Sequence, residues 1–226
     1  ADMLQAERLS LTGKIARTIA HEVRNPLTSL NLALDELREE IPAQNKRAKV
    51  YSDIIERSAH RIEQLVDEML NSSKPKQLCL ALHSIDQIIT DTISLGLDRL
   101  QLNQIQLQTN FEDSLPRVLV DKEKIQIALL NIIINAIEAM VPGKGVLRID
   151  SSITDKIITV AITDNGKGIS AADCGRLYDP FFTSKYNGMG LGLTSAKNIL
   201  NSHSAQVHVK SELHKGTTFY VNFKVG

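Results

Sequence analysis

The chain of 226 residues contains no tryptophan, few other aromatic residues and only two cysteines, Cys79 and Cys174. Without aromatic side chains on which bases could stack, we expect no nucleic-acid-binding surface. The two thiols match no metal-ligand spacing, and they are compatible with a reducing cytosol. The 26 basic and 26 acidic residues balance, so no net electrostatic field favours nucleic acid or an anionic membrane.

Long apolar runs are also missing. No stretch of about eighteen apolar residues occurs, so we expect no membrane contact from this fragment. The first residues, Ala1-Asp2-Met3, lack the basic-then-apolar pattern of a signal peptide. Because the chain does not begin with methionine, we expect it to be either a processed chain or a fragment.

What the chain does contain begins with a long helical stripe. Apolar residues recur at alternating spacings of four and three, at Leu11, Ile15, Ile19, Val23, Leu27, Leu30, Leu34, Leu37 and Ile41. This pattern predicts a helix over about residues 4–41, a break at 41–45 and a second helix that ends near 71–75. Two helices with a short connector predict an antiparallel hairpin. To cover its stripe, the hairpin either forms a dimeric four-helix bundle, which we favour, or packs on the rest of its own chain.

After Pro75 the pattern changes to a mixture of strands and helices. Alternation predicts strands at 77–82, 105–108, 118–120, 146–153, 157–163, 206–210 and 217–224. Helices are predicted from 84 towards 97, from 121 to about 140 and over 193–201. No regular strand–helix–strand repeat is present, so this half predicts an α+β sandwich, a mixed sheet covered by helices. The predicted domains are therefore 1–74 and 75–226.

A polar cluster interrupts the first helix at His21, Glu22, Arg24 and Asn25, and Pro26 follows it. His21 lies two positions from the nearest residue of the apolar stripe, so it should face away from the core. A lone histidine of this kind is more often a solvated surface residue than a reactive group. Only a nucleotide-binding signature elsewhere in the chain would favour the reactive interpretation.

Asn131, Asn135 and Glu138 stand at i, i+4 and i+7 on a helix that is otherwise apolar nearly all round. Buried amides need polar partners. One candidate partner is a hydrated Mg²⁺ with phosphate oxygens, since this ion prefers oxygen ligands. The alternative is a structural network of amides.

Period-two alternation places Asp164 on the apolar face of a strand, directly before a turn that contains Gly166 and Gly168. A carboxylate in this place needs a hydrogen-bond donor. The donor is either within the turn itself or an exocyclic amine such as that of adenine, which a glycine turn would allow to approach.

A second glycine motif, Gly188-x-Gly190-x-Gly192, runs into a predicted helix, where free backbone amides suit a phosphate. Its spacing fits neither the dinucleotide fingerprint nor a P-loop. Before it, Phe181 and Phe182 suggest an apolar anchor for a flap in which Lys185 meets terminal phosphates. The alternative is a pair of core phenylalanines and a solvated lysine.

Taken in order, these motifs resemble those of the sensor histidine kinases of two-component signalling, and the resemblance covers nearly the whole chain. The form of the first motif and the short segment 183–187 are most similar to the nitrogen-regulation sensors. The resemblance implies a dimerisation and histidine phosphotransfer domain, followed by an ATP-binding sandwich of the Bergerat (GHKL) fold.

The resemblance also implies roles for single residues. His21 would take the γ-phosphoryl group of ATP and pass it to an aspartate of a response-regulator receiver domain, with Glu22 and Asn25 as its catalytic neighbours. Asn135 would be the ligand of Mg²⁺. The residues implied to bind ATP are Asn131, Asn135, Glu138, Asp164, Gly166, Gly168, Lys185, Gly188, Gly190, Gly192 and Thr217 or its neighbour Thr218.

The family further implies a homodimer, dephosphorylation of the regulator and a cytoplasmic location, either free or as the cytoplasmic part of a membrane-anchored sensor. Two other classes of protein stay open. One is an ATPase or chaperone of the same ATP fold without histidine phosphorylation, against which the hairpin with His21 argues. The other is a non-catalytic dimerisation module or degenerate kinase, against which His21, Asn135 and Asp164 argue.

Overall fold

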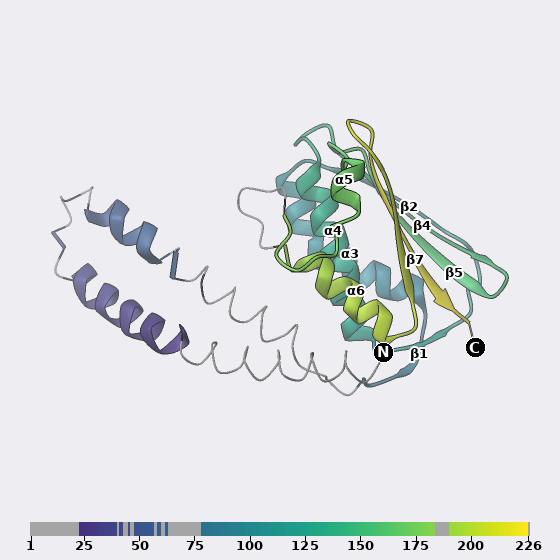
Figure 1. The fold of residues 1–226 in the computed structure, drawn as a ribbon, viewed down its shortest axis with the longest axis horizontal. Coiled ribbons are helices and arrows are strands. Elements are labelled where there is room, and N and C mark those ends of the chain that lie inside the picture. The colour runs from purple at the N-terminus through teal and green to yellow at the C-terminus, as the bar shows by residue number, and fades with distance from the viewer. Residues whose placement is uncertain are drawn as a thin grey trace. The chain divides into compact units, whose positions relative to one another are not determined.

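The computed structural model describes residues 23–39, 41–42, 45, 48–56, 58–59, 62, 78–183 and 190–225. The chain divides into two compact units, Ala1–Lys76 and Gln77–Gly226 (Figure 1). Among the described helices, none is long and apolar enough to cross a membrane.

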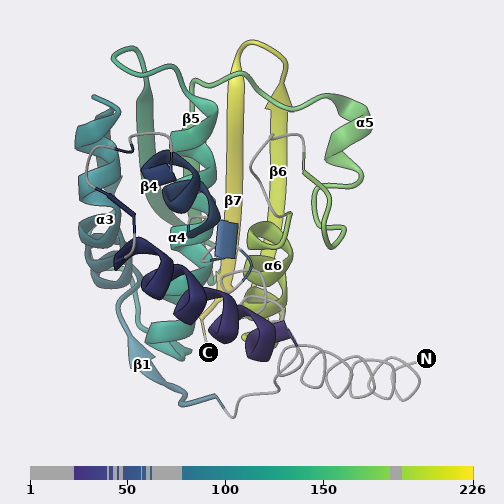
Figure 2. The ribbon, with the colours of Figure 1, turned by 90° about the vertical axis from the view of Figure 1, so that its left-hand side faces the viewer.

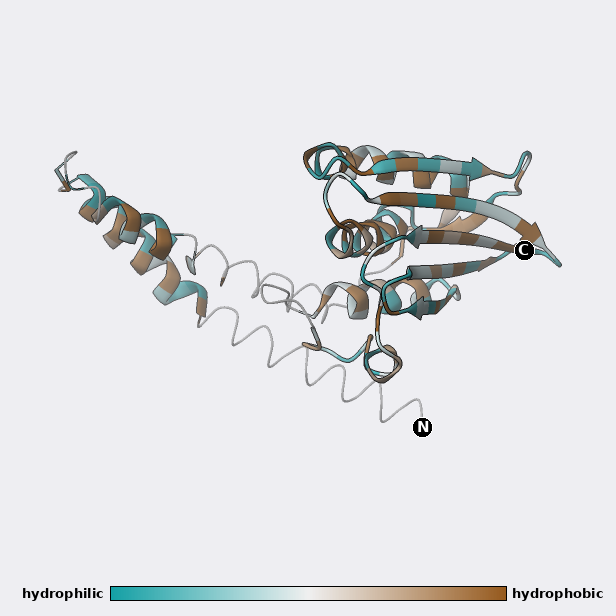
Figure 3. Ribbon diagram, turned by 90° about the horizontal axis from the view of Figure 1, so that it is seen from above, coloured by the Kyte–Doolittle hydropathy of each residue, from teal (hydrophilic) through white to brown (hydrophobic). Residues whose placement is uncertain are grey.

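The described part of the first unit contains a helix over 23–39 and a second helical stretch over 48–56. Arg38 joins them, since its Nε donates to Ser52 Oγ at 2.6 Å and its Nη2 pairs with Asp53 Oδ1 at 2.7 Å and Glu56 Oε2 at 2.8 Å. Because the connection is short, these contacts make the two stretches an antiparallel hairpin, as the apolar stripe predicts. Apolar residues lie along both helices (Figure 3).

The second unit is a sandwich of a sheet and a layer of helices (Figure 2). The sheet has the strand order β2–β4–β5–β7–β6, in which β2 is parallel to β4 and all other neighbours are antiparallel. The mixed sheet predicted from the sequence is thus confirmed. Its strands are β2 (Gln106–Phe111), β4 (Val146–Thr154), β5 (Ile157–Asp164), β6 (Gln206–Glu212) and β7 (Gly216–Lys224). A separate pair joins β1 (Ala81–His83) to β3 (Val118–Val120).

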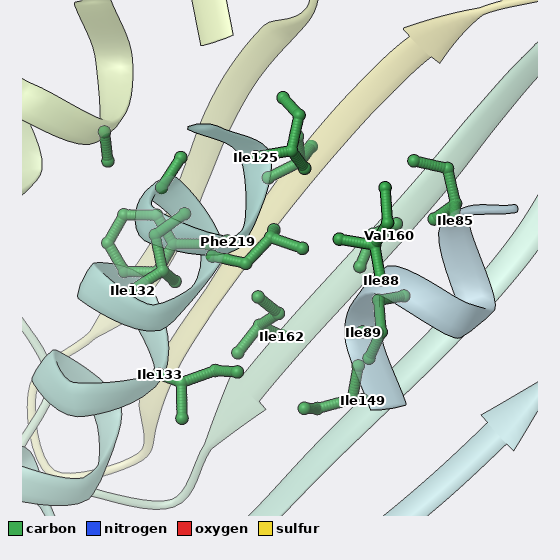
Figure 4. Close-up of a cluster of buried hydrophobic side chains, with 14 of the residues drawn as sticks. Ile85, Ile88, Ile89, Ile125, Ile132, Ile133, Ile149, Val160, Ile162 and Phe219 are labelled. Atoms are coloured by element: carbon green, nitrogen blue, oxygen red, sulfur yellow. The ribbon is translucent and has the colours of Figure 1, made fainter. Parts of the chain in front are cut away.

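Three long helices cover one face of the sheet: α3 (Ile85–Leu102), α4 (Lys122–Ala139) and α6 (Gly192–Ser202). Each of the first two begins where a side chain accepts a backbone N–H: Ser84 caps α3 and Asp121 caps α4. The core lies between the helices and the sheet and is rich in isoleucine (Figure 4). Ile85 and Ile88 of α3 and Ile132 of α4 are essentially inaccessible to solvent there.

The structure corrects the predicted bounds of several elements. The strand expected at 77–82 is only Ala81–His83, because its partner β3 offers three residues for pairing. Helix α3 continues five residues past the predicted end, since Leu100 of its last turn is buried in the core. A short helix, α5 (Ala171–Cys174), was not predicted, although Ser170 caps it with a bond from the Asp173 N–H.

Candidate functional site

Asp164 ends β5 on the face of the sheet that the helices cover. It continues the buried series of Ile158, Val160 and Ile162 and is only 4% exposed. Its Oδ1 accepts the N–H of Gly166 at 2.8 Å. A buried carboxylate requires such donors, and its two oxygens together offer about four acceptor positions. This acceptor capacity suits a polar ligand as well as the turn.

Thr217 lies opposite Asp164 in the register of β5 and β7, and it is equally buried. Its hydroxyl is 2.9 Å from the Ser211 hydroxyl, which donates to the Gly216 carbonyl and accepts the Ile169 N–H. Since the one proton of Ser211 is used, Thr217 must donate to Ser211.

Of Thr217 and Thr218, only Thr217 shares the face of Asp164. Thr218 lies on the other face, with its hydroxyl 3.1 Å from that of Thr163. Sequence reasoning missed Ser211, whose role depends on the pairing of β6 with β7.

The turn after Asp164 is held in place from two sides. The N–H of Lys167 donates to the carbonyl of Ala139 at the end of α4, at 3.0 Å, and the Lys167 carbonyl accepts the His214 N–H at 2.8 Å. Gly168 has a φ of +68°, and a Cβ there would lie 2.1 Å from the Glu212 carbonyl oxygen. Only glycine fits this position, so the turn approaches both α4 and the β6–β7 connection.

Asn131 and Asn135 lie on α4, on the side that meets the start of α6. A Cβ on Gly192 would be 3.5 Å from Asn131 Oδ1 and 3.9 Å from Asn135 Nδ2. The Asn135 Nδ2 donates to the backbone oxygen of Asn131 at 2.9 Å, so the amide oxygen of Asn135 points to the other side. The structure therefore brings the two asparagines to the second glycine motif.

Glu138 stands one turn further along α4 and is exposed. Its Oε1 is 3.6 Å from Nη1 of Arg99 on α3. This exposed ion pair directs Glu138 towards α3, so the structure gives it a partner that sequence reasoning did not foresee.

The two phenylalanines occupy different surroundings. Phe182 is half-buried, with the Arg176 guanidinium 4.4 Å above its ring, whereas Phe181 is 64% exposed. The N–H of Phe181 donates to the Gly190 carbonyl at 3.1 Å, and both residues have a positive φ. This bond closes the chain across the segment between them, whose residues 184–189, including Lys185 and Gly188, lie outside the described part.

His21 and Glu22 also lie outside the described residues. Asn25 is exposed in the helix over 23–39 of the first unit.

Tyr178, between α5 and the phenylalanines, makes two contacts with α6. Its carbonyl accepts the Thr194 hydroxyl at 3.1 Å, and the Lys197 Nζ lies 4.4 Å from the centre of its ring. Among the described side chains, its hydroxyl is the buried group that lacks a hydrogen-bond partner. Burial, with a smaller contribution from Cys174, raises the pKa of Tyr178 to about 12.

We expect Tyr178→Phe to stabilise the second unit by about 1 kcal/mol, because it removes an unsatisfied buried hydroxyl. In thermal unfolding at neutral pH this is a rise in Tm of about 3 °C. The wild type should also lose stability as the pH rises from about 10, where an exposed tyrosine ionises, to about 12, and the variant should not. Tyr220→Phe is the matched control, and an equal gain in Tm there would contradict the assignment to Tyr178.

Two families match the chain. Residues 12–78 match the His Kinase A (phospho-acceptor) domain, and residues 120–226 match the family described as histidine kinase-, DNA gyrase B-, and HSP90-like ATPase. The second match contains every site residue discussed above for the second unit.

Among curated proteins, the sensor histidine kinase ZraS of Escherichia coli (strain K12) is 32% identical over 218 residues, which cover 96% of this chain and 46% of ZraS. Sporulation kinase A of Bacillus subtilis (strain 168) is 32% identical over 222 residues, which cover 98% of this chain and 36% of that protein. The chain thus spans about half the length of these relatives or less.

Solved structures share the fold at lower identity. Full-length ShkA in complex with AMPPNP superposes with a TM-score of 0.76 at 23% identity, covering 94% of this chain and 46% of ShkA. The histidine kinase ThkA in complex with the response regulator protein TrrA gives a TM-score of 0.71 at 24% identity, covering 97% of this chain and 63% of ThkA. The two domain matches and the kinase relatives together show that this chain belongs to the sensor histidine kinases, with a phosphoacceptor domain followed by an ATP-binding domain.

Proposed function

We propose that this chain transfers the γ-phosphoryl group of ATP to His21 and then to an aspartate of a response-regulator receiver domain. The observation that carries the proposal is the gathering of polar residues around the C-terminal half of α4. Asp164 reaches it through the turn that contacts Ala139, and Gly192 lies beside Asn131 and Asn135. In this proposal residues 1–74 hold the phosphoacceptor and residues 75–226 bind ATP.

The adenine end of ATP would bind at Asp164, whose carboxylate accepts a hydrogen bond from the exocyclic amine, with Thr217 beside it. The phosphates would lie at the start of α6, where the N-cap Leu191 supplies no side-chain bond and the backbone amides of the first turn are oriented for an anion. Lys185, Gly188 and Gly190 would complete the flap over the phosphates.

The donor chemistry of Asn135 fits Mg²⁺. Its amide nitrogen is bonded back to Asn131, and an amide oxygen is the kind of ligand this ion takes together with phosphate oxygens. When bound, the ion neutralises charge on the phosphates. The part of this chain in the transfer is to hold ATP and present its γ-phosphate to His21.

In the first step a bond forms between a ring nitrogen of His21 and the γ-phosphorus, and the bond from that phosphorus to the bridging oxygen breaks, so ADP leaves. Glu22 accepts a hydrogen bond from the other ring nitrogen, which fixes the tautomer and makes the ring more nucleophilic. In the second step the phosphoryl group moves to a carboxylate oxygen of the regulator and the imidazole is regenerated. The complex of ThkA with a response regulator supports a partner of this class.

A homodimer through the hairpin is part of the proposal. The described part of the hairpin exposes apolar side chains that its two helices do not cover, which are Leu30, Leu32, Leu37, Val50, Tyr51, Ile54, Ile55 and Ile62. A second hairpin would bury them in a four-helix bundle.

The test is incubation of the purified chain with γ-labelled ATP and Mg²⁺, followed by exposure of the labelled protein to acid and to base. We expect a label that survives base but not acid, as phosphohistidine does. Release of labelled phosphate without labelled protein would instead favour an ATPase of the same fold. If the chain were neither labelled nor able to bind ATP, the result would favour a non-catalytic dimerisation module.

We expect Asn135→Ala to remove the magnesium-dependent part of ATP binding. Losing an oxygen ligand that helps to neutralise phosphate charge should cost about 3 kcal/mol, or roughly a hundredfold in affinity. Calorimetric titration with ATP, with and without Mg²⁺, measures the effect. Asn198→Ala, on the exposed side of α6, is the control, and unchanged affinity of Asn135→Ala with Mg²⁺ would return the asparagines to a structural role.

We expect Asn25→Ala to separate two activities of the proposed enzyme. An amide is no base, so autophosphorylation of His21 should be nearly unchanged. An amide can orient a water, however, so dephosphorylation of the regulator should slow by about a hundredfold. The decay of separately phosphorylated regulator is followed with each variant. Thr28→Ala, exposed on the same helix, should behave as wild type, and equal decay with Asn25→Ala would leave Asn25 without a catalytic role.

A further inference from the structure

A polar cluster joins the N-terminus of α4 to the C-terminus of α6. The backbone N–H of Asp121 donates to Nε2 of His203 at 3.1 Å, and Nδ1 of the same ring donates to the Ile199 carbonyl at 2.7 Å. Because Nε2 accepts a hydrogen bond while Nδ1 donates one, the imidazole must be neutral with its proton on Nδ1.

The carboxylate of Asp121 extends this cluster to the beginning of the second unit. It is 7% exposed; Oδ1 accepts the Lys124 N–H at 3.1 Å and so caps α4, and Oδ2 accepts the Cys79 N–H at 3.0 Å. Cys79 is the third residue of the second unit. We refer to Asp121, His203 and Cys79 as the Asp121 cluster.

The cluster and the candidate site lie at opposite ends of one helix pair. Gly192 begins α6 beside Asn131 and Asn135, whereas His203, just after the end of α6, reaches Asp121 at the start of α4. The two helices therefore run antiparallel, and the bond to His203 fixes their relative position at the end away from the site. A shift of α6 along α4 would move Gly192 relative to the two asparagines.

We propose that neutral His203 is a positioning residue for the nucleotide site, and that its protonation releases α6 from α4 and loosens the beginning of the second unit at Cys79. A protonated ring carries N–H groups on both nitrogens, so Nε2 and the Asp121 N–H become two donors that face each other. The Asp121 carboxylate is the charged acceptor of the same residue, and an Nε2–H that turned towards it would compete with the N–H groups of Cys79 and Lys124. Protonation would thus draw His203 away from the backbone N–H of Asp121 and towards the carboxylate that caps α4.

The charges around His203 are consistent with a move of the protonated ring towards the Asp121 carboxylate. Burial raises the pKa of Asp121, but the bonds from Cys79 and Lys124 and the charge of Lys124, with that of His203 once its ring is protonated, outweigh burial and leave the pKa below its usual range. Asp121 therefore stays ionised over the range in which histidines titrate, about pH 5 to 8. Lys122 is engaged by Asp91 of α3 at 2.8 Å, and the Ser202 hydroxyl is 3.3 Å from Nδ1.

The cluster can be tested without ATP, by hydrogen–deuterium exchange of the whole chain at pH 8 and pH 5.5, corrected for the intrinsic effect of pH. In the wild type we expect protection of the amides of Cys79 and Asp121 to fall about tenfold at pH 5.5. This is the change in the opening equilibrium that the loss of one hydrogen bond produces. His203→Gln keeps an acceptor but cannot be protonated, so its protection should not depend on pH. His208→Gln, exposed on β6, should respond as wild type. Equal protection of the wild type at both pH values, or equal pH dependence in His203→Gln, would overturn the proposal.

The effect on the nucleotide rests on the proposed function and needs a second measurement. Affinity for Mg-ATP should fall several-fold more between pH 8 and 5.5 in the wild type than in His203→Gln, a comparison that removes the ionisation of ATP itself. If the Asp121 cluster responded to pH but the chain bound no ATP, the proposed function would be refuted while the pH response of the cluster would stand. Binding of ATP with equal pH dependence in both proteins would refute the positioning role.

Discussion

Asp164→Asn is expected to lower the affinity for Mg-ATP about a hundredfold while leaving the fold intact. The Gly166 N–H holds one oxygen of Asp164 at 2.8 Å, and an asparagine would place its oxygen there to keep that bond. Its NH₂ group would then stand where a carboxylate oxygen would receive the adenine amine, so two donors would face each other. Losing a bond to a charged acceptor at a buried site costs about 1.5 to 3 kcal/mol.

The measurement is calorimetric titration with Mg-ATP beside a thermal unfolding curve. Asp155→Asn makes the same chemical change in the exposed turn between β4 and β5, where φ is +49° and asparagine is well tolerated. It should bind ATP as the wild type does. If Asp164→Asn kept full affinity with an unchanged Tm, Asp164 would be a residue of the turn and not of the adenine site.

His21→Gln is expected to abolish labelling by γ-labelled ATP while affinity for ATP stays within a few-fold of wild type. The reason is that the proposed acceptor and the proposed nucleotide site belong to different units of the chain. Glutamine keeps a polar side chain of similar size but has no nitrogen lone pair that can accept a phosphoryl group.

His208→Gln controls for the loss of a histidine as such and should be labelled normally. Base-stable, acid-labile label on His21→Gln would show that another residue is the acceptor. Loss of ATP binding together with loss of label would show that the substitution acts on the nucleotide site and not on the acceptor.

The candidate site was largely predictable because its polar residues stand at positions where the surrounding strand or helix is apolar. Asp164 is a carboxylate at a buried position of a strand, and Asn131 and Asn135 are amides on an apolar helix. Such exceptions cost free energy unless a partner satisfies them, so they stand out in a single sequence. Ser211 gives no such signal, since a serine on an edge strand is ordinary. Only its hydrogen bonds to Thr217 and Ile169 in the structure identify it as part of the candidate site.

The sequence by itself determined the order of the motifs, the hairpin followed by a mixed sandwich, and the faces on which Asp164 and the two asparagines lie. These features depend on periodicity and on local capping, which act over a few residues. Only the tertiary structure decided that Thr217 and not Thr218 faces Asp164, that Glu138 pairs with Arg99, and that Asp121 holds both His203 and Cys79. Those contacts join residues far apart in the chain, and strand register and helix packing fix them through the burial of the whole core, which no local pattern encodes.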